Sequence, residues 1–127
     1  MDGKRMQSVS GGSHWGGGVF INSFDQARIG LLMQRDGVWA GKRLLSEDYM
    51  RQAVAPCDVY QDYGFMWWLN KSGQRLPSAE TDGFCAVGFG SNIIWVEPEL
   101  DLVAVVRWIE RETFDGFCGS VMAALRD

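Results

Sequence analysis

The chain has 127 residues, of which 46% are hydrophobic and 22% are charged, and its formal net charge at pH 7 is -4. This composition excludes a disordered chain, and the length predicts a single domain over residues 1–127 with a modest core. The negative charge argues against nucleic acid and anionic membrane as partners, because both attract basic patches. No apolar run approaches the roughly 20 residues that a membrane-spanning helix requires.

Three cysteines, Cys57, Cys85 and Cys118, lie far apart in the sequence. An odd count without Cys-x-x-Cys spacing argues against a disulfide framework and against a zinc site. We therefore expect buried, reduced thiols in a cytoplasmic protein, with a reactive thiol as the alternative. A single histidine cannot build a metal site by itself, and no motif in the chain implies a cofactor.

A glycine-rich segment, Ser10 to Gly18, contains five glycines in nine residues and predicts a loop. It holds His14, the only histidine, next to Trp15. Glycine lets a ligand approach the backbone closely, so His14 and Trp15 are candidates for a substrate pocket. The alternative interpretation is a linker or turn that carries a surface histidine.

Two helices are expected after this loop. Ser23 and Gln26 have the spacing of a capping box, which predicts a helix that begins at Ser23 and stops near Gly37. Ser46 is a suitable cap for a second, short helix that Pro56 ends. The apolar face of the first helix is predicted at Phe24, Ala27, Leu31 and Leu32.

Aromatic residues predict a strand over Tyr63 to Asn70. Within it, Trp67 and Trp68 are interpreted either as core packing or as the wall of a hydrophobic pocket. Core packing is favoured, because aromatic side chains dominate the buried area of small domains. The polar residues from Lys71 to Gly83 predict a loop.

The stretch from Phe84 to Ile109 predicts two strands joined by a tight connection. Runs rich in Val, Ile and Trp flank the polar break Glu97 to Asp101, and Pro98 belongs in the turn because it cannot donate to a sheet. The segment Leu102 to Val106 is continuously apolar, which is typical of a strand covered on both faces.

The last predicted element is a helix with one apolar face. Thr113 is a suitable cap, and apolar residues follow it at spacings of three and four. We expect this stripe to cover one face of the sheet. It consists of Phe114, Phe117, Cys118, Val121, Met122 and Leu125.

Motifs alone name no enzyme. The chain contains no Ser-x-x-Lys, no Gly-x-Ser-x-Gly, no His-Glu-x-x-His and no phosphate-binding Gly-x-x-x-x-Gly-Lys. Glu97, Glu99 and Asp101 are predicted to form a solvated hairpin tip. Glu110 and Glu112 alternate with arginines, which indicates surface charge pairing.

The order of several short motifs resembles a known family. A glycine-rich loop leads to a capped helix, then to Gly-x-x-x-Gly-x-x-Leu-Leu-Ser from Gly37 and Tyr-Gly-Phe-Met-Trp-Trp from Tyr63. Gly-Phe-Gly-Ser from Gly88 then runs into the Val-Glu-Pro-Glu-Leu-Asp-Leu-Val of residues 96–103. From about Val9 to Leu125 the chain resembles the C-terminal third of serine hydrolases of the class C β-lactamase and penicillin-binding type. Esterases and 6-aminohexanoate-oligomer-hydrolase-like members are the most similar.

The resemblance implies an α+β fold, part of the β-lactamase-like (serine-transpeptidase-like) fold. The implied part is a three-stranded antiparallel sheet with N-terminal helices and a C-terminal helix packed on it. The family's Ser-x-x-Lys nucleophile and Tyr-x-Asn motifs are missing, and its third motif would lie near Ala86-Val87-Gly88 without a Lys or His. No catalytic residue is therefore expected. The candidate pocket residues are His14, Trp15, Gly88, Phe89, Gly90 and Ser91, with a backbone oxyanion-hole donor near Ser91.

Three functional hypotheses follow. The chain is expected to be a non-catalytic fragment or free-standing remnant of such a hydrolase, or the substrate-binding half of a split esterase or amidase completed by another chain. A third option is hydrolysis by His14 and a nearby serine. The strand from Leu102 to Ile109 lacks the neighbour that the family's N-terminal part supplies, so we expect a homodimer through this edge. The alternative is that Met1 to Val19 folds back over the edge.

Overall fold

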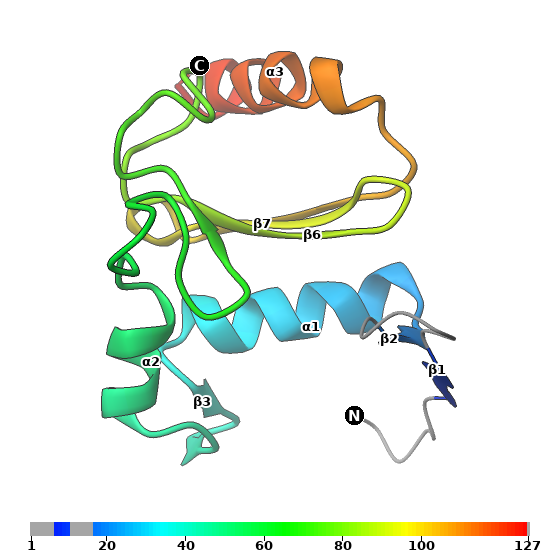
Figure 1. The fold of residues 1–127 in the computed structure, drawn as a ribbon, viewed down its shortest axis with the longest axis vertical. Coiled ribbons are helices and arrows are strands. Elements are labelled where there is room, and N and C mark those ends of the chain that lie inside the picture. The colour runs from blue at the N-terminus through cyan, green and yellow to red at the C-terminus, as the bar shows by residue number, and fades with distance from the viewer. Residues whose placement is uncertain (1–6, 11–16, 127) are drawn as a thin grey trace.

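The computed structural model describes residues 7–10 and 17–126 of the chain. The described part contains three α-helices, a four-stranded antiparallel sheet and two separate pairs of short strands. The sheet lies between α1 (Ser23–Gln34) on one face and α3 (Phe114–Arg126) on the other, as Figure 1 shows. The predicted α+β class is confirmed.

The sheet has one strand more than the sequence predicts. Its strands, in spatial order, are β5 (Trp68–Leu69), β6 (Phe84–Gly88), β7 (Asn92–Glu97) and β8 (Leu102–Val106). The sequence indicates one continuous strand before Pro98. In the structure a turn divides that run into β6 and β7, and Gly90 and Ser91 in the turn have φ angles of 71° and 51°. The second connection is as predicted, with Pro98 in the 3-10 turn η1 (Pro98–Leu100).

The core is divided into two layers by the sheet. On the α1 side, Met33, Ile94 and Val96 are buried, together with residues from α2 and from the β5 region. On the α3 side, Trp95 is completely buried against Phe114 and the residues around it. Residues of β8 pack against both layers, as predicted for Leu102 to Val106, although each of them stays partly exposed.

Helix α1 begins at Ser23, as predicted, but its N-cap is the residue before it. Asn22, not Ser23, is the N-cap, and its side-chain oxygen accepts a hydrogen bond from the Asp25 backbone N–H at 2.9 Å. The predicted apolar face is also wrong, since Phe24 is 79% exposed. The buried positions of the helix are Gln26, Gly30 and Met33. Gly30 faces the sheet. Because it has no side chain, the helix can approach β7 and β8 closely at this point.

The segment after α1 follows the sequence prediction. Gly37 lies past the end of the helix with a φ of 76°, a conformation that glycine adopts without strain. The short strands β3 (Val38–Trp39) and β4 (Lys42–Arg43) then pair with each other. Helix α2 (Glu47–Ala53) is capped by Ser46, whose hydroxyl accepts from the Tyr49 N–H at 3.1 Å. It ends before Pro56, as expected.

The predicted strand over residues 63–70 is shorter in the structure. Only β5 pairs with β6, while Tyr63 forms an isolated bridge with Trp68 across a tight loop. Trp67 is buried and its ring meets Phe84 at a centroid distance of 5.2 Å. The core interpretation of Trp67 is thereby confirmed. Trp68 is half-buried and lies against Tyr63, with ring centroids 4.6 Å apart.

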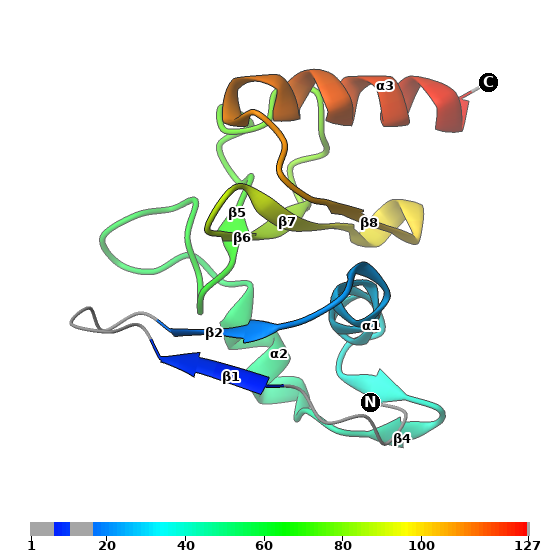
Figure 2. The same ribbon diagram turned by 90° about the vertical axis from the view of Figure 1, so that its right-hand side faces the viewer.

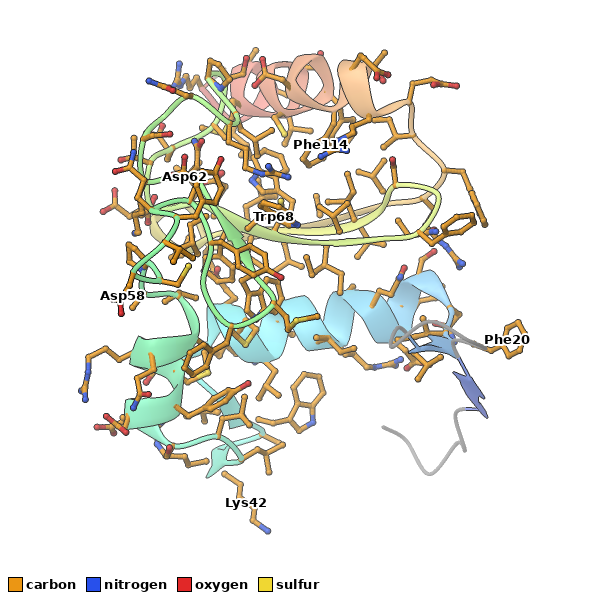
Figure 3. The ribbon with its side chains drawn as sticks, viewed as in Figure 1. Phe20, Lys42, Asp58, Asp62, Trp68 and Phe114 are labelled. Atoms are coloured by element: carbon orange, nitrogen blue, oxygen red, sulfur yellow. The ribbon has the colours of Figure 1, made fainter. Side chains whose placement is uncertain are left out.

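Helix α3 covers the opposite face of the sheet, as predicted. Phe114, Cys118 and Met122 are its buried residues, and Figure 3 shows Phe114 pointing from the helix toward the sheet. Leu125 departs from the predicted stripe because it is 53% exposed. The last turn of the helix extends past the sheet in Figure 2, so little apolar surface is available to cover this side chain.

The start of α3 also differs from the prediction. Thr113 ends a 3-10 turn, η2 (Arg111–Thr113), and its hydroxyl donates to the Glu110 carbonyl at 2.8 Å. The hydroxyl therefore closes the preceding turn.

None of the helices in residues 7–10 and 17–126 combines the length and apolar composition that crossing a membrane requires.

The N-terminal strands do not cover the open edge of the sheet. β1 (Gln7–Ser10) and β2 (Gly17–Phe20) pair only with each other, and β8 is the last strand of its sheet. Residues 7–10 and 17–19 therefore do not pair with the β8 edge, and the rest of the Met1 to Val19 segment, for which this fold-back was the alternative, lies outside the described residues. The hairpin precedes α1 directly, and this connection keeps β2 on the α1 side of the sheet (Figure 2).

We predict opposite effects for the same substitution at two helical glycines. A Cβ at Gly30 would lie 2.5 Å from Val103 Cγ1 and 2.8 Å from Ile94 Cγ2, and these β-branched side chains are stiff. Gly30→Ala should lower the free energy of unfolding, because overpacking of about 1–3 kcal/mol outweighs a helix-propensity gain of about 1 kcal/mol.

Gly116→Ala in α3 is the matched control. No heavy atom lies within 4 Å of a Cβ at that position, so only the propensity gain remains. Urea denaturation of both variants measures the difference. Equal stabilisation of the two proteins would show that α1 does not pack on the sheet as closely as described.

Candidate functional site

The end of β6 and the turn that follows it hold four of the six predicted pocket residues, but the structure does not bring these four into one site. Gly88 and Ser91 border pockets on opposite faces of the sheet. Phe89 is 94% exposed and lines neither pocket. Gly90 is covered by the Trp108 indole, which a Cβ on Gly90 would meet at 2.1 Å. His14 and Trp15 lie outside the described residues.

The larger of these two pockets is an apolar groove of about 460 Å³ on the α1 side of the sheet. That volume lies within the roughly 300–1,000 Å³ of typical small-molecule sites. The side-chain oxygen of the buried Gln26 has no hydrogen-bond partner among the described residues. The groove is lined by Val19, Ile21, Gln26, Ile29, Met66, Ala86, Val87, Gly88, Asn92 and Ile94.

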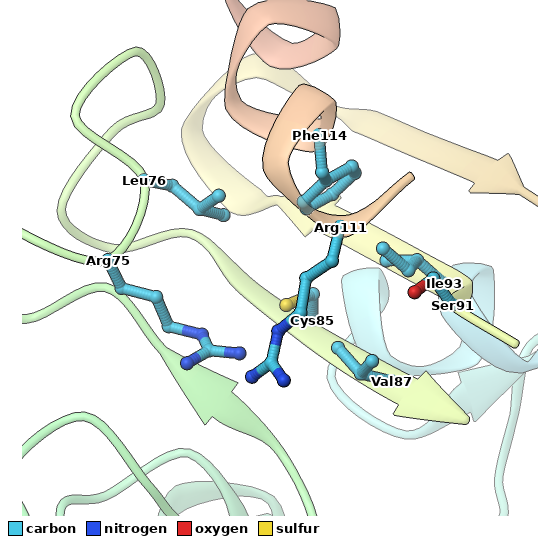
Figure 4. A pocket seen from close by; sticks show the side chains of 8 residues that line it. All are labelled: Arg75, Leu76, Cys85, Val87, Ser91, Ile93, Arg111 and Phe114. Carbon is cyan, nitrogen blue, oxygen red and sulfur yellow. The ribbon is translucent and has the colours of Figure 1, made fainter. Parts of the chain in front are cut away.

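A smaller pocket of about 120 Å³ lies on the α3 side. Figure 4 shows two arginines entering it from separate segments, Arg75 from the loop before β6 and Arg111 from η2. Arg75 also lies over the Trp68 ring, 4.0 Å from its centroid. The remaining lining residues are Leu76, Cys85, Val87, Ser91, Ile93 and Phe114.

Neither pocket contains a nucleophile with a base. Ser91 is the hydroxyl on the α3 side, and among the described lining residues no His, Lys or carboxylate accompanies it. The described lining of the groove contains no Ser, Thr or Cys. Acyl transfer by a hydroxyl or thiol requires a partner that activates the nucleophile. The described residues of the two pockets are suited to binding. The groove on the α1 side has an apolar lining, and the pocket on the α3 side has two arginines.

The sequence did not single out Arg75, Arg111 or Gln26 as functional residues. Arg75 belongs to a segment predicted only as a loop, and Arg111 was assigned to surface charge pairing. No local pattern could have joined them, because the two arginines meet only after α3 and the loop pack on the same face of the sheet. The capping-box interpretation placed Gln26 at the start of the helix and gave no sign that its side chain is buried.

Metal binding receives no support from the part of the chain that the structure describes. It contains no group of three or more His, Cys, Asp or Glu side chains that could hold a metal ion. All three cysteines are free thiols, of which Cys85 and Cys118 are buried and Cys57 is partly exposed. No protein-family model matches the chain.

Glu97 is a buried carboxyl at the far end of β7, which corrects the prediction that it lies at a solvated hairpin tip. Glu99 and Asp101 are exposed, as predicted. Strand alternation turns Glu97 to the same face as Trp95, whose indole Nε1–H donates to Glu97 Oε1 at 2.6 Å. Oε2 of Glu97 has no hydrogen bond of good geometry among the described residues.

Burial raises the pKa of Glu97 from its ordinary value of 4.5 to about 7. The hydrogen bond from Trp95 lowers the pKa, while the negative charges of Asp82 and Glu80 raise it further. The folded state therefore favours the protonated carboxyl. With respect to this group, the free energy of unfolding is greatest below pH 4.5 and falls as the pH rises through about 7.

We predict that Glu97→Gln removes this pH dependence. At about pH 8 the variant should be more stable than the wild type, by on the order of 3 kcal/mol, because the amide is isosteric and carries no charge to bury. Urea denaturation at about pH 5 and about pH 8 measures the effect. Glu99→Gln, at an exposed neighbouring acid, serves as the control. A Glu97→Gln protein that is less stable than the wild type at the higher pH would contradict the prediction.

Proposed function

We propose that this chain is a non-catalytic relative of serine hydrolases of the class C β-lactamase and penicillin-binding type, which acts through self-association. The observation that carries the proposal is the open edge of β8, the last strand of the sheet. Its two faces are covered by helices, yet it pairs with β7 alone and ends the sheet. A strand that is partly buried on both faces and open at one edge is suited to receive another strand.

The edge lacks the features that normally prevent such pairing. Natural edge strands are protected by lysine, proline, bulges or a covering segment. β8 contains neither Lys nor Pro, and it pairs with β7 in continuous register from Leu102 to Val106. Arg107 follows the strand, and its guanidinium hydrogen-bonds to Asn92 and to the Ile21 carbonyl.

A second copy is the simplest occupant of this edge. Two β8 strands that meet antiparallel across a two-fold axis satisfy each other's free N–H and C=O groups, because the same residues occur on both sides. The three free thiols agree with a reducing, cytoplasmic environment for such a dimer. Among the described residues, neither pocket brings a nucleophile together with a base.

The apolar groove favours a second candidate function. A pocket of about 460 Å³ that reaches Gly88 is suited to an acyl or alkyl chain. On this alternative, the chain is the substrate-binding half of a split esterase or amidase, and another chain supplies the nucleophile. The strand that completes β8 would then belong to that other chain, and the protein alone would be monomeric.

The oligomeric state distinguishes the two candidates. Self-association predicts a dimer by light scattering at micromolar concentrations. It also predicts slow hydrogen exchange for every amide in β8, including those directed away from β7. Val105→Lys should yield a folded monomer, because Val105 belongs to neither core layer and a charge on an edge strand opposes pairing. Ser120→Lys, which adds the same charge on the exposed side of α3, should remain a dimer. A wild-type monomer would reject the first proposal.

Hydrolysis is tested separately. We expect no turnover of nitrocefin or p-nitrophenyl esters above that of Ser91→Ala, since no described base accompanies the Ser91 hydroxyl. Labelling by a serine-reactive fluorophosphonate provides an independent measurement. A single labelled serine, together with turnover that the reagent abolishes, would overturn the non-catalytic assignment.

A further inference from the structure

The small pocket on the α3 side has an excess of positive charge. Figure 4 shows the guanidinium groups of Arg75 and Arg111 pointing toward one another beside Cys85. Arg75 is half-buried in the loop before β6, and Arg111 is exposed at the start of η2. Two like charges that converge in one pocket repel each other, and the repulsion is strongest where apolar walls reduce the dielectric constant.

No carboxylate compensates this charge in the described part of the chain. The ion pairs there involve Arg28, Arg43, Arg51 and Arg126, and none involves Arg75 or Arg111. Asp115, in the first turn of α3, is engaged elsewhere, since its two oxygens accept from the backbone N–H and the hydroxyl of Ser78 at 3.0 Å. The two guanidinium groups are thus left with donors that face an open pocket.

The other polar lining groups are donors as well. Burial raises the pKa of the Cys85 thiol, and Arg75 offsets only part of this effect, so the thiol stays neutral and contributes no negative charge. The Ser91 hydroxyl borders the same pocket. Leu76, Val87, Ile93 and Phe114 form the apolar walls and keep part of the pocket from water.

We propose that this pocket binds a small oxyanion, a carboxylate or phosphate group, between Arg75 and Arg111, with the Ser91 hydroxyl as an additional donor. The planar guanidinium fork matches the paired oxygens of both groups and can bind either of them through two parallel hydrogen bonds. Stacking on Trp68 holds the Arg75 fork in place before the ligand arrives, which reduces the entropy lost on binding.

The size of the pocket limits the ligand. A volume of about 120 Å³ is well below that of sites for drug-sized molecules, so a small anion or the charged end of a larger molecule fits, and a nucleotide does not. The site lies on the opposite side of the sheet from the apolar groove and away from the β8 edge. It therefore does not depend on self-association or on hydrolase ancestry.

The test is a titration of the full chain followed by nuclear magnetic resonance of the backbone amides and arginine Nε groups. The probes are sodium phosphate and, separately, sodium acetate, with sodium chloride at the same ionic strength as the reference. Either oxyanion should produce saturable shifts at Ser91, Arg75 and Arg111. The stronger binder of the two identifies the ligand as a phosphate or a carboxylate.

Two variants and a control locate the binding. Arg111→Gln and Arg75→Gln should each weaken the affinity by about tenfold or more, because each removes charge-assisted hydrogen bonds. Arg51→Gln, at an exposed arginine of α2 that pairs with Asp48, should bind as the wild type does. Arg111 is exposed, so its replacement leaves the fold intact even if Arg75→Gln loses stability with the Trp68 contact. Shifts that do not saturate with either oxyanion, or binding to Arg111→Gln with the wild-type affinity, would overturn the proposal.

Discussion

The structure depends on the close packing of α1 against β7 and β8. Gly30 provides the contact, since any side chain there would overlap Val103 and Ile94. Val96 is completely buried on the α1 side of the sheet, and Trp95 is completely buried on the other side against α3. Two helices can thus enclose a sheet of short strands and still bury a core on each face, which a chain of this length needs in order to be stable.

Sequence patterns predicted the parts of this arrangement that local chemistry determines. Ser46 caps α2 because of its own hydroxyl, and Pro98 lies in a turn because it has no N–H. The contact at Gly30 could not be predicted from apolar periodicity, because glycine contributes nothing to an apolar stripe. Glu97 was misplaced for a different reason. Its proximity to a turn suggested solvent, whereas its alternation with Trp95 would have indicated the core.

The candidate site was even less predictable from local sequence than the fold. Gly88 and Ser91 are close in sequence, yet they border pockets on opposite faces, which follows from the strand geometry and not from the motif that contains them. Arg75 and Arg111 are distant in sequence, and only the fold places them together. No β8 residue lines either pocket. A strand added along β8 would therefore leave both the groove and the cationic pocket open to ligands.

The two faces of the sheet also differ in how much of the chain they require during folding. The α3 face is built from residues 68–122, and β6, β7 and β8 join by short turns, so its contacts close shorter loops than those of the α1 face. The α1 face draws on residues from 29 to 103, and closing so long a loop costs more conformational entropy. We infer that the α3 layer forms first and that α1 docks afterwards. Until it docks, Ile94, Val96 and Val103 present an uncovered apolar surface on a nascent sheet, and folding at high protein concentration would be most prone to aggregation at that stage.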